Sequence, residues 1–415
     1  MKKTPASGSI TRCQICKNNK LLLVLSLGHH PILQRYLSEK QLREPETTYP
    51  LNLVYCSTCG LSQLNYCIDP ALLFNQNYPY RTGLTNMLRK NFDALAGEMF
   101  DTGYYQQGDL VVDIGSNDGT LLEQFKKRGA LVLGVEPTGA AQEARRADIR
   151  TLQEFFTKKT VSTIKEKYGV PQIITATNVF AHIVDLSTLL NNIKHCMGKN
   201  SVFVSESQYL VDIIEKVEFD TVYDEHLRYY SLKPMIRMFS MHGMSLVDAE
   251  HISAAGGSIR VYAKTGNHAM SKRAKELLKK EQRLGLYKRA TLAAFARQAH
   301  RAKNDLMALL LKQKRNGKTI AALTSAGRSN TLLNFAKIDT TLIDYIGEKK
   351  SSPKIGLYTP GSHIPVVDEF RIIEKQPDYL LVLSWHIGAE LIQIMRKMGY
   401  KGKFIIPLPN PRIVT

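Results

Sequence analysis

Apolar positions follow two alternating periods along this chain of 415 residues. Short apolar runs bounded by turn residues are typical of buried strands, whereas apolar residues at steps of three and four are typical of helices. From about residue 76 to 270 the two patterns alternate, which predicts an α/β fold. The predicted strands of this region are 110–114, 131–135, 172–176, 201–205, 245–249 and 259–263.

The patterns divide the rest of the chain into three further regions. Residues 1–75 hold most of the cysteines between short apolar runs and turns. Residues 271–318 are helical in pattern, and residues 319–415 alternate again, which predicts a second, smaller α/β domain. Its predicted strands are 319–323, 342–346, 379–383 and 403–406. The apolar run 21–27 is too short for a membrane span and lacks a signal-peptide layout, so we expect a cytoplasmic protein without a membrane partner.

The chain is strongly basic, with 56 Lys+Arg, 37 Asp+Glu and a formal net charge of +19. Residues 272–318 hold 15 Lys/Arg against 3 Asp/Glu, a local net charge of +12. This concentration favours a linking helical segment with a solvated basic face, and a wall beside an anionic ligand is the functional alternative. Nucleic acid is not the expected partner, because no helix-turn-helix, zinc-finger or RNA-binding aromatic motif accompanies the charge.

Four of the six cysteines form two Cys-x-x-Cys pairs separated by 39 residues. The four are Cys13, Cys16, Cys56 and Cys59. Two such pairs complete a tetrahedral sulfur shell that suits Zn²⁺ and leaves no position open for a substrate. We therefore expect a structural zinc site, with a redox pair or four unrelated buried thiols as alternatives. Cys67 and Cys196 are expected to be small buried apolar residues.

A glycine loop follows the first strand of the middle region. The apolar run ends at Asp113, and Gly115, Asn117 and Gly119 come between it and a predicted helix. Glycine allows a tight turn and a close approach of backbone to ligand, but the Gly-x-Gly-x-x-Gly pattern of NAD sites is absent. Glu136 ends the next strand, where a carboxylate accepts hydrogen bonds from ribose hydroxyls. The pattern resembles the S-adenosylmethionine (SAM) site of class I methyltransferases, with Asp113 beside the amino-acid portion of SAM.

A short turn with a polar residue at each end follows the strand predicted at 172–176. Asn178 begins this turn and His182 ends it. Ligands of open α/β sheets bind at the carboxyl ends of strands, so we expect Asn178 beside the cofactor and His182 in the same site. The segment Tyr78-Pro79-Tyr80 is a candidate source of phenol donors for this cleft, with simple packing between domains as the alternative.

A second segment is dense in titratable side chains. Glu206 and Tyr209 come first, and Tyr223, Glu225 and His226 follow within an aromatic run. His226 is the natural base at neutral pH, and a nearby carboxylate would raise its basicity. We therefore predict that this segment supplies a proton acceptor and the groups that orient it.

Taken in order, these motifs resemble the three-domain sugar C-methyltransferases. The matching motifs are the two Cys-x-x-Cys pairs, Asp-Ile-Gly-Ser-Asn-Asp-Gly-Thr-Leu, Gly-Val-Glu-Pro, Asn-Val-Phe-Ala-His, Phe-Asp-x-x-Tyr-x-Glu-His, Gly-Gly-Ser-Ile-Arg-Val and Pro-Gly-Ser-His-Ile-Pro. The resemblance spans nearly the whole chain. It implies a zinc-binding module over 1–75, a class I SAM methyltransferase (Rossmann-like) core over 76–270, a basic helical link over 271–318 and a C-terminal Rossmann-like α/β domain over 319–415.

The resemblance also implies a reaction and its residues. The family methylates carbon in nucleotide-activated 4-keto-deoxy sugars, at C-3 in most members and at C-5 in some, for branched-chain deoxysugar biosynthesis. It implies SAM and structural Zn²⁺ as cofactors and His226 as general base. Tyr223 and Glu225 are expected beside that base, with His182 and Tyr78 in the same pocket. We expect a monomer or weak oligomer.

This chain departs from the family pattern at several positions. Asp224 stands where His is usual, Leu323 and Arg328 lie in a loop that usually reads with Tyr, Gly and Lys, and His386 replaces Asn. The alternatives are a small-molecule O-methyltransferase, a zinc-containing nucleic-acid methyltransferase and a non-catalytic SAM-binding protein. The nucleic-acid methyltransferase lacks support, because neither an Asp/Asn-Pro-Pro-aromatic motif nor a Pro-Cys pair is present in the sequence.

Overall fold

A computed structural model describes residues 7–74, 81–84 and 86–415 of the chain. The N-terminal region forms a four-stranded antiparallel sheet in the order β11-β4-β3-β2 and a two-stranded sheet of β1 and β5. Its elements are β1 Gly8–Ser9, β2 Leu21–His30, η1 Lys40–Arg43, β3 Tyr49–Cys56, β4 Ser62–Leu64, β5 Tyr66–Cys67 and α1 Pro70–Leu73. The edge strand β11, Arg228–Tyr229, comes from the middle of the chain. The sheet therefore joins two regions that are far apart in sequence.

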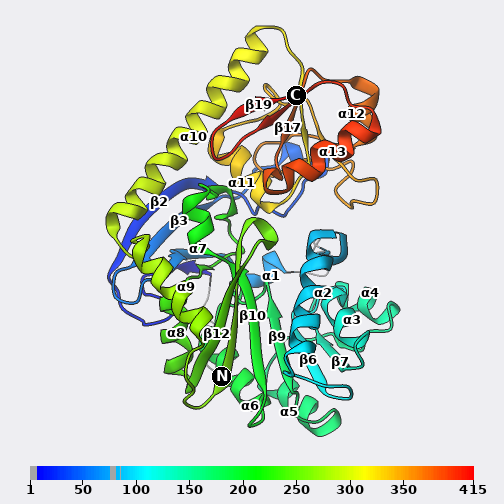
Figure 1. The fold of residues 1–415 in the computed structure, drawn as a ribbon. Coiled ribbons are helices and arrows are strands. Elements are labelled where there is room, and N and C mark those ends of the chain that lie inside the picture. Colours follow the sequence, from blue (N-terminus) through cyan, green and yellow to red (C-terminus); the bar gives the residue numbers. More distant parts are fainter. Residues whose placement is uncertain (1–6, 75–80, 85) are drawn as a thin grey trace.

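The middle region forms a seven-stranded sheet in the order β12-β13-β10-β9-β6-β7-β8, with helices beside the strands (Figure 1). Its strands are β6 Leu110–Ile114, β7 Leu131–Val135, β8 Thr151–Leu152, β9 Ile173–Thr177, β10 Val202–Gln208, β12 Met244–Ile252 and β13 Ser258–Thr265. Its helices are η2 Thr82–Leu84, α2 Asn86–Asp101, α3 Thr120–Lys126, α4 Ala140–Arg146, α5 Lys158–Lys167, α6 Leu186–Cys196, α7 Leu210–Glu215, η3 Phe219–Thr221, α8 Leu232–Met241 and η4 Ala254–Gly256.

The strand order of this sheet defines where a ligand can bind. Strands β6, β7, β8, β9 and β10 are parallel, while β13 pairs antiparallel with β10 and β12 with β13. The chain runs outward from β6 through β7 to β8 on one side and resumes at β9 on the other. Such a reversal opens a crevice at the carboxyl ends of the central strands, which here are β6 and β9.

Two helices carry the basic segment, α9 (Lys272–Arg283) and α10 (Arg289–Arg315). Figure 1 shows α10 running from the middle region to the C-terminal domain, past the strands of the N-terminal region. The apolar positions of α10 are buried, and its basic residues Arg297, Arg301 and Lys312 are exposed. The predicted helical character and the solvated basic face are thus both observed.

The C-terminal domain has a six-stranded sheet in the order β16-β15-β14-β17-β18-β19. Its elements are β14 Ile320–Leu323, α11 Gly327–Ala336, β15 Ile346–Glu348, β16 Val366–Asp368, α12 Phe370–Lys375, β17 Tyr379–Val382, η5 Trp385–Ile387, α13 Gly388–Met398, β18 Lys403–Ile406 and β19 Arg412–Val414. The strand predicted at 342–346 is wrong, because pairing with β14 and β16 begins only at Ile346. Leu342 and Ile343 are buried in a loop instead.

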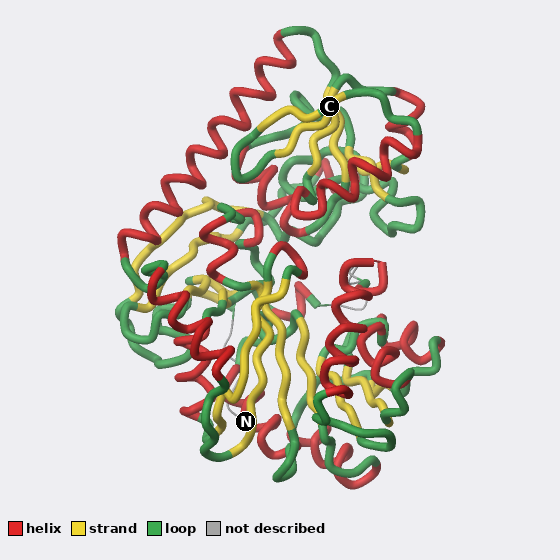
Figure 2. The backbone as a smooth tube through the Cα atoms, in the orientation of Figure 1, coloured by secondary structure: helices red, strands yellow, loops and turns green. Residues whose placement is uncertain are grey.

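One cluster of buried apolar side chains runs through all three regions and includes Leu53, Phe203 and Leu332. Figure 2 shows the strands of the middle and C-terminal sheets flanked by helices. Because the regions share a core, the ends of the middle strands stay in a fixed position against the other two regions. Among the residues that the structure describes, no helix is long and apolar enough to cross a membrane.

Candidate active site and metal centre

The four paired cysteines meet at one point beside β3. Their sulfur atoms all lie within 4.8 Å of one another, with Cys13 Sγ 3.4 Å from Cys59 Sγ and Cys16 Sγ 3.6 Å from Cys56 Sγ. A tetrahedral Zn²⁺ with Zn–S bonds of about 2.3 Å separates its sulfur ligands by about 3.8 Å, so the cluster fits this ion. Four sulfur ligands close the shell, which makes the site structural.

The remaining two cysteines are single buried thiols. Cys67 and Cys196 are 5% and 0% exposed and belong to the apolar core. Within the described ranges, the four paired cysteines are the one group of His, Cys, Asp or Glu ligands close enough to hold a metal ion. The sequence predictions for all six cysteines are confirmed.

The glycine loop turns directly at the end of β6. Gly115 and Gly119 have positive φ angles of 70° and 81°, and Gly119 precedes the first residue of α3. A Cβ at Gly115 would lie only 2.4 Å from Val179 Cγ2, so only glycine fits between the loop and its neighbour. The loop thus brings bare backbone to the carboxyl end of β6, which is the cradle that SAM requires.

Glu136 and Asp113 flank this loop. Glu136 is buried, and its two carboxylate oxygens accept hydrogen bonds from the Asn117 N–H (3.0 Å) and the Thr138 N–H (2.8 Å). Each oxygen retains a second acceptor position, which the ribose hydroxyls expected here can use. Asp113 accepts a hydrogen bond of 2.7 Å from Thr175 Oγ1, and burial raises the pKa of its carboxyl to about 7. Both predicted acids therefore lie at the predicted crevice.

A single turn connects the glycine loop to the second half of the site. The Asn178 N–H donates to the Glu206 carbonyl (2.9 Å), and the φ angle of Asn178 is 57°. Val179, the next residue, packs on Gly115, and its carbonyl accepts from the His182 N–H (2.8 Å). Cofactor loop and imidazole are therefore separated by one turn of backbone.

His226 lies between η3 and β11 with its Nδ1 3.3 Å from the Thr221 carbonyl oxygen. Because a carbonyl only accepts, the proton belongs on Nδ1, and Nε2 keeps a lone pair. Burial, together with the neighbouring His182 and with Arg328, lowers the pKa of His226 well below its ordinary value. The sequence predicts instead that a carboxylate raises its basicity. Burial is the largest cause of the shift, so the imidazole is neutral at pH 7 and able to accept a proton.

Aromatic rings lie beside this base. The His182 ring stacks on His226 with centroids 5.0 Å apart, and the Tyr223 ring lies 4.0 Å from it at 42°. Phe74 stacks in turn on His182 at 5.5 Å. Burial and the positive charge of Arg228 lower the pKa of His182 to about 4, so both imidazoles are neutral at pH 7. The structure thus brings together His182, Tyr223 and His226.

Glu225 and Tyr78 are the other two residues predicted for this pocket. Glu225 precedes His226, and its side chain is buried with 2% exposure. Tyr78 lies outside the described residues. The residues on either side of that segment contact the site, because Phe74 stacks on His182 and the Thr82 N–H donates to Asn117 Oδ1 (3.0 Å).

Comparisons with known proteins identify each part of the chain. Family models described as a zinc binding domain, a methyltransferase domain and a C-methyltransferase C-terminal domain match residues 13–74, 84–249 and 253–409. The C-methyltransferase NovU of Streptomyces niveus is 29% identical over 410 residues, which cover 98% of this chain and 97% of NovU. The chain therefore resembles a C-methyltransferase along nearly its whole length, and its three parts match the three models in order.

Solved structures resemble part of this methyltransferase. Magnesium protoporphyrin IX methyltransferase of Synechocystis PCC 6803 with bound SAH is 13% identical, with a TM-score of 0.34 over 43% of this chain and 84% of that one. A SAM-dependent methyltransferase of Clostridium acetobutylicum is 12% identical, with a TM-score of 0.34 over 43% and 92%. The methyltransferase uses SAM in its middle domain and holds zinc in its N-terminal one.

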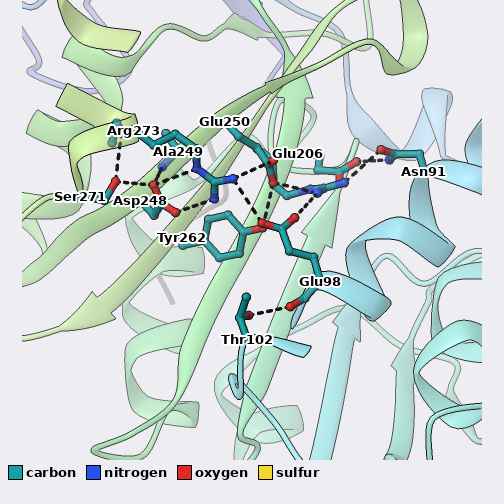
Figure 3. Close-up of polar contacts among 12 residues, drawn as sticks. Asn91, Glu98, Thr102, Glu206, Asp248, Ala249, Glu250, Tyr262, Ser271 and Arg273 are labelled. Atoms are coloured by element: carbon teal, nitrogen blue, oxygen red, sulfur yellow. Dashed lines mark hydrogen bonds and ion pairs between the residues drawn. The ribbon is translucent and has the colours of Figure 1, made fainter. Parts of the chain in front are cut away.

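Glu206 of the methyltransferase belongs to an ion-pair network (Figure 3). Arg260 donates from Nε to Glu206 (2.6 Å) and from Nη1 to Glu250 (2.8 Å), while Asn91 Nδ2 donates to the other Glu206 oxygen (2.8 Å). Arg273 of α9 joins at Glu250 with 3.1 Å. The network connects α2, β10, β12, β13 and α9, and the backbone carbonyl of Glu206 accepts from the Asn178 N–H.

Tyr209 is likewise structural, because its buried hydroxyl donates to Glu281 Oε1 of α9 at 2.9 Å. The sequence shows both residues only as members of a segment dense in titratable groups. Both lie on the same stretch of sequence as the base, but their polar atoms have hydrogen-bond partners on other elements.

The residues that depart from the family pattern also have clear partners. Arg328 at the start of α11 donates to both oxygens of Asp220, at 2.9 and 3.1 Å, and Trp385 Nε1 donates to the same carboxylate at 2.9 Å. Arg328 thus connects the C-terminal domain to η3. Asp224 accepts from the Leu33 N–H of the zinc module (3.1 Å), and burial raises the pKa of its carboxyl to about 7.

Two other departures lie within the C-terminal domain. Leu323 ends β14 and is buried in the core of that domain. His386 follows Trp385 in η5, and burial lowers the pKa of its imidazole well below the ordinary value. Its ring is therefore neutral at pH 7.

Proposed function

We propose that this methyltransferase transfers the methyl group of SAM to carbon in a nucleotide-activated 4-keto-deoxy sugar, and that the methylated carbon is C-3. The observation that carries the proposal is the pair of neutral imidazoles one turn from the SAM loop. The whole-length similarity to a protein named as a C-methyltransferase supports carbon as the acceptor. The residues beyond 319 are proposed to hold the nucleotide end of the substrate.

The chemistry requires a base, because carbon must lose a proton before it can attack a methyl group. A carbon next to a ketone loses that proton when the charge can spread to the oxygen as an enolate. His226 Nε2 is proposed to accept the proton. Its Nδ1 faces the Thr221 carbonyl and therefore carries the ring proton, which leaves a lone pair on Nε2. Tyr223 is proposed to donate a hydrogen bond to the charged oxygen, in the way that an oxyanion hole does. SAM supplies a methyl group on sulfonium sulfur, which is a good leaving group.

The identity of the acceptor is tested by product analysis. Purified protein is incubated with methyl-labelled SAM and a panel of nucleotide 4-keto-6-deoxy sugars, and the products are examined by mass spectrometry and NMR. A new carbon–methyl signal at C-3 supports the proposal, whereas an oxygen–methyl signal or label on another class of acceptor contradicts it.

The role of His226 is tested by substitution. His226→Ala is expected to lower turnover by about 10²-fold or more while SAM binding is retained, in line with general-base contributions. Exchange of the substrate's acidic proton with deuterated water in the presence of SAH should be lost in the same variant. The control is His195→Ala, because His195 is exposed at the end of α6. Turnover like that of the wild type in His226→Ala would remove this residue from the role of base.

A further inference from the structure

Arg228 is a fully buried arginine two residues after the proposed base. Its side chain is 1% exposed, and it lies on β11, the strand that joins the sheet of the zinc module. Within the described part of the chain, the acceptors of its guanidinium are all neutral: the Tyr230 hydroxyl (2.9 Å), the side-chain oxygen of Gln14 and three backbone carbonyls. A buried charge without an ionic partner is costly unless hydrogen bonds satisfy it, and these neutral acceptors supply them.

The three carbonyls belong to the turn that carries His182. Arg228 Nη2 donates to the Phe180 carbonyl (3.3 Å), the Ala181 carbonyl (3.5 Å) and the Ile183 carbonyl. These residues bracket His182 on both sides. The planar guanidinium of Arg228 therefore holds the backbone around His182. Arg228 itself lies two residues after His226 in the chain.

Gln14 extends this arrangement to the metal centre. It stands between Cys13 and Cys16, and its side-chain Nε2 donates to the Leu227 carbonyl (3.1 Å) while its oxygen accepts from Arg228. Leu227 directly follows His226, and its N–H donates to the Ala181 carbonyl (3.0 Å). One amide side chain thus reaches from the zinc knuckle to the residues after the base.

We propose that Gln14 and Arg228 are positioning residues, which transmit the rigid geometry of the zinc knuckle to His182 and His226. The zinc module then acts on catalysis without touching substrate, because two cysteine ligands fix Gln14 and Gln14 fixes the histidine loops. This proposal rests on the proposed role of His226. Displacement of reacting groups by about 1 Å costs about 10²-fold in rate.

The test compares variants that break this connection with one that breaks another bond of the same module. Gln14→Met keeps the length of the side chain and removes both hydrogen bonds, and Arg228→Lys keeps the charge without the planar fork. Tyr55→Phe is the matched control, because the Tyr55 hydroxyl donates to the Tyr287 carbonyl (3.0 Å), away from both histidines. Zinc content is measured for every variant before assay.

We expect kcat to fall about 10–100-fold in Gln14→Met and Arg228→Lys, with SAM affinity and zinc content unchanged and with Tyr55→Phe like the wild type. Carbon-13 NMR of labelled histidine should show shifted ring signals of His182 and His226 in the same two variants. This second measurement needs no substrate, so it stands even if the proposed sugar is wrong.

Unchanged ring signals together with unchanged kcat in zinc-loaded Gln14→Met would overturn the proposal, as would an equal loss in Tyr55→Phe. Loss of zinc or of folding in Gln14→Met also counts against it, because Gln14 would then serve the stability of the module. If Arg228→Lys does not fold, Gln14→Met decides the question alone.

Discussion

Replacement of Gly115 by Ala probes the contact between the SAM loop and the turn that carries His182. The φ angle of Gly115 is 70°, and a Cβ there would lie 2.4 Å from Val179 Cγ2 and 3.0 Å from Cγ1. Two separate costs are therefore expected. One is the backbone strain of a side chain in the left-handed region, and the other is the collision with a β-branched neighbour of limited freedom.

The two costs can be measured separately. Left-handed backbone costs a non-glycine residue about 1–2 kcal/mol, and overpacking costs about 1–3 kcal/mol more. Gly103→Ala supplies the matched control, because its φ angle is 73° and a Cβ there would meet nothing within 4 Å. The difference between the two variants is then the collision alone. The double variant Gly115→Ala/Val179→Ala should recover that part and leave the strain.

The assay is SAM affinity by calorimetry together with the urea midpoint. If the loop must return to its native geometry to bind SAM, a collision of about 1–3 kcal/mol raises Kd by about 5–150-fold. Gly103→Ala should leave Kd unchanged. The reasoning would be refuted if Gly115→Ala bound SAM like Gly103→Ala, or if Val179→Ala failed to restore binding in the double variant.

Three further predictions concern buried groups. Asp224→Asn removes a carboxyl whose pKa burial raises to about 7; because the folded state holds this proton more tightly, wild-type stability falls as pH rises from about 4 to about 7. The variant should therefore gain stability over the wild type at pH 8 but not at pH 4 in urea unfolding, and an equal offset at both pH values would contradict this. Arg328→Met leaves its partner carboxylate buried without a cation, at a cost of about 3–5 kcal/mol, so its urea midpoint should drop far more than that of the exposed-face variant Arg297→Met. Cys56→Ser should lower zinc from about one ion per chain to none by atomic absorption, while Cys196→Ser keeps it, and zinc retained in the first would argue against four sulfur ligands.

Local patterns in the sequence predicted much of the fold. The strands predicted at 110–114, 131–135 and 403–406 coincide with β6, β7 and β18. Each is an apolar run bounded by turn residues, so nearby residues in the sequence determine where the strand begins and ends. The same holds for the cysteine pairs, because each pair places two ligands within one turn. The strand predicted at 342–346 failed where boundaries depend on hydrogen bonds to other strands, and β15 begins at Ile346.

The candidate site shows the same division. The sequence alone predicted Asp113, Glu136, His182 and His226 as site residues, because each follows a strand end or lies in a dense polar motif. It did not separate Glu206 from these residues, since its partner Arg260 is 54 positions away. Its expectation for the basicity of His226 was also wrong, because burial is a property of the assembled fold.

By itself, then, the sequence determined the chemistry that is available: the metal ligands, the glycine loop, the acids and the imidazoles. Only the tertiary structure decided which of these groups are free to react and which are held by partners. Arg228 is the clearest case, because its contact with Gln14 spans 214 positions and no local pattern records it. The only local signal was a basic residue inside a buried aromatic run. The physical reason is that hydrogen bonds and burial depend on distance in space, which the folded core sets.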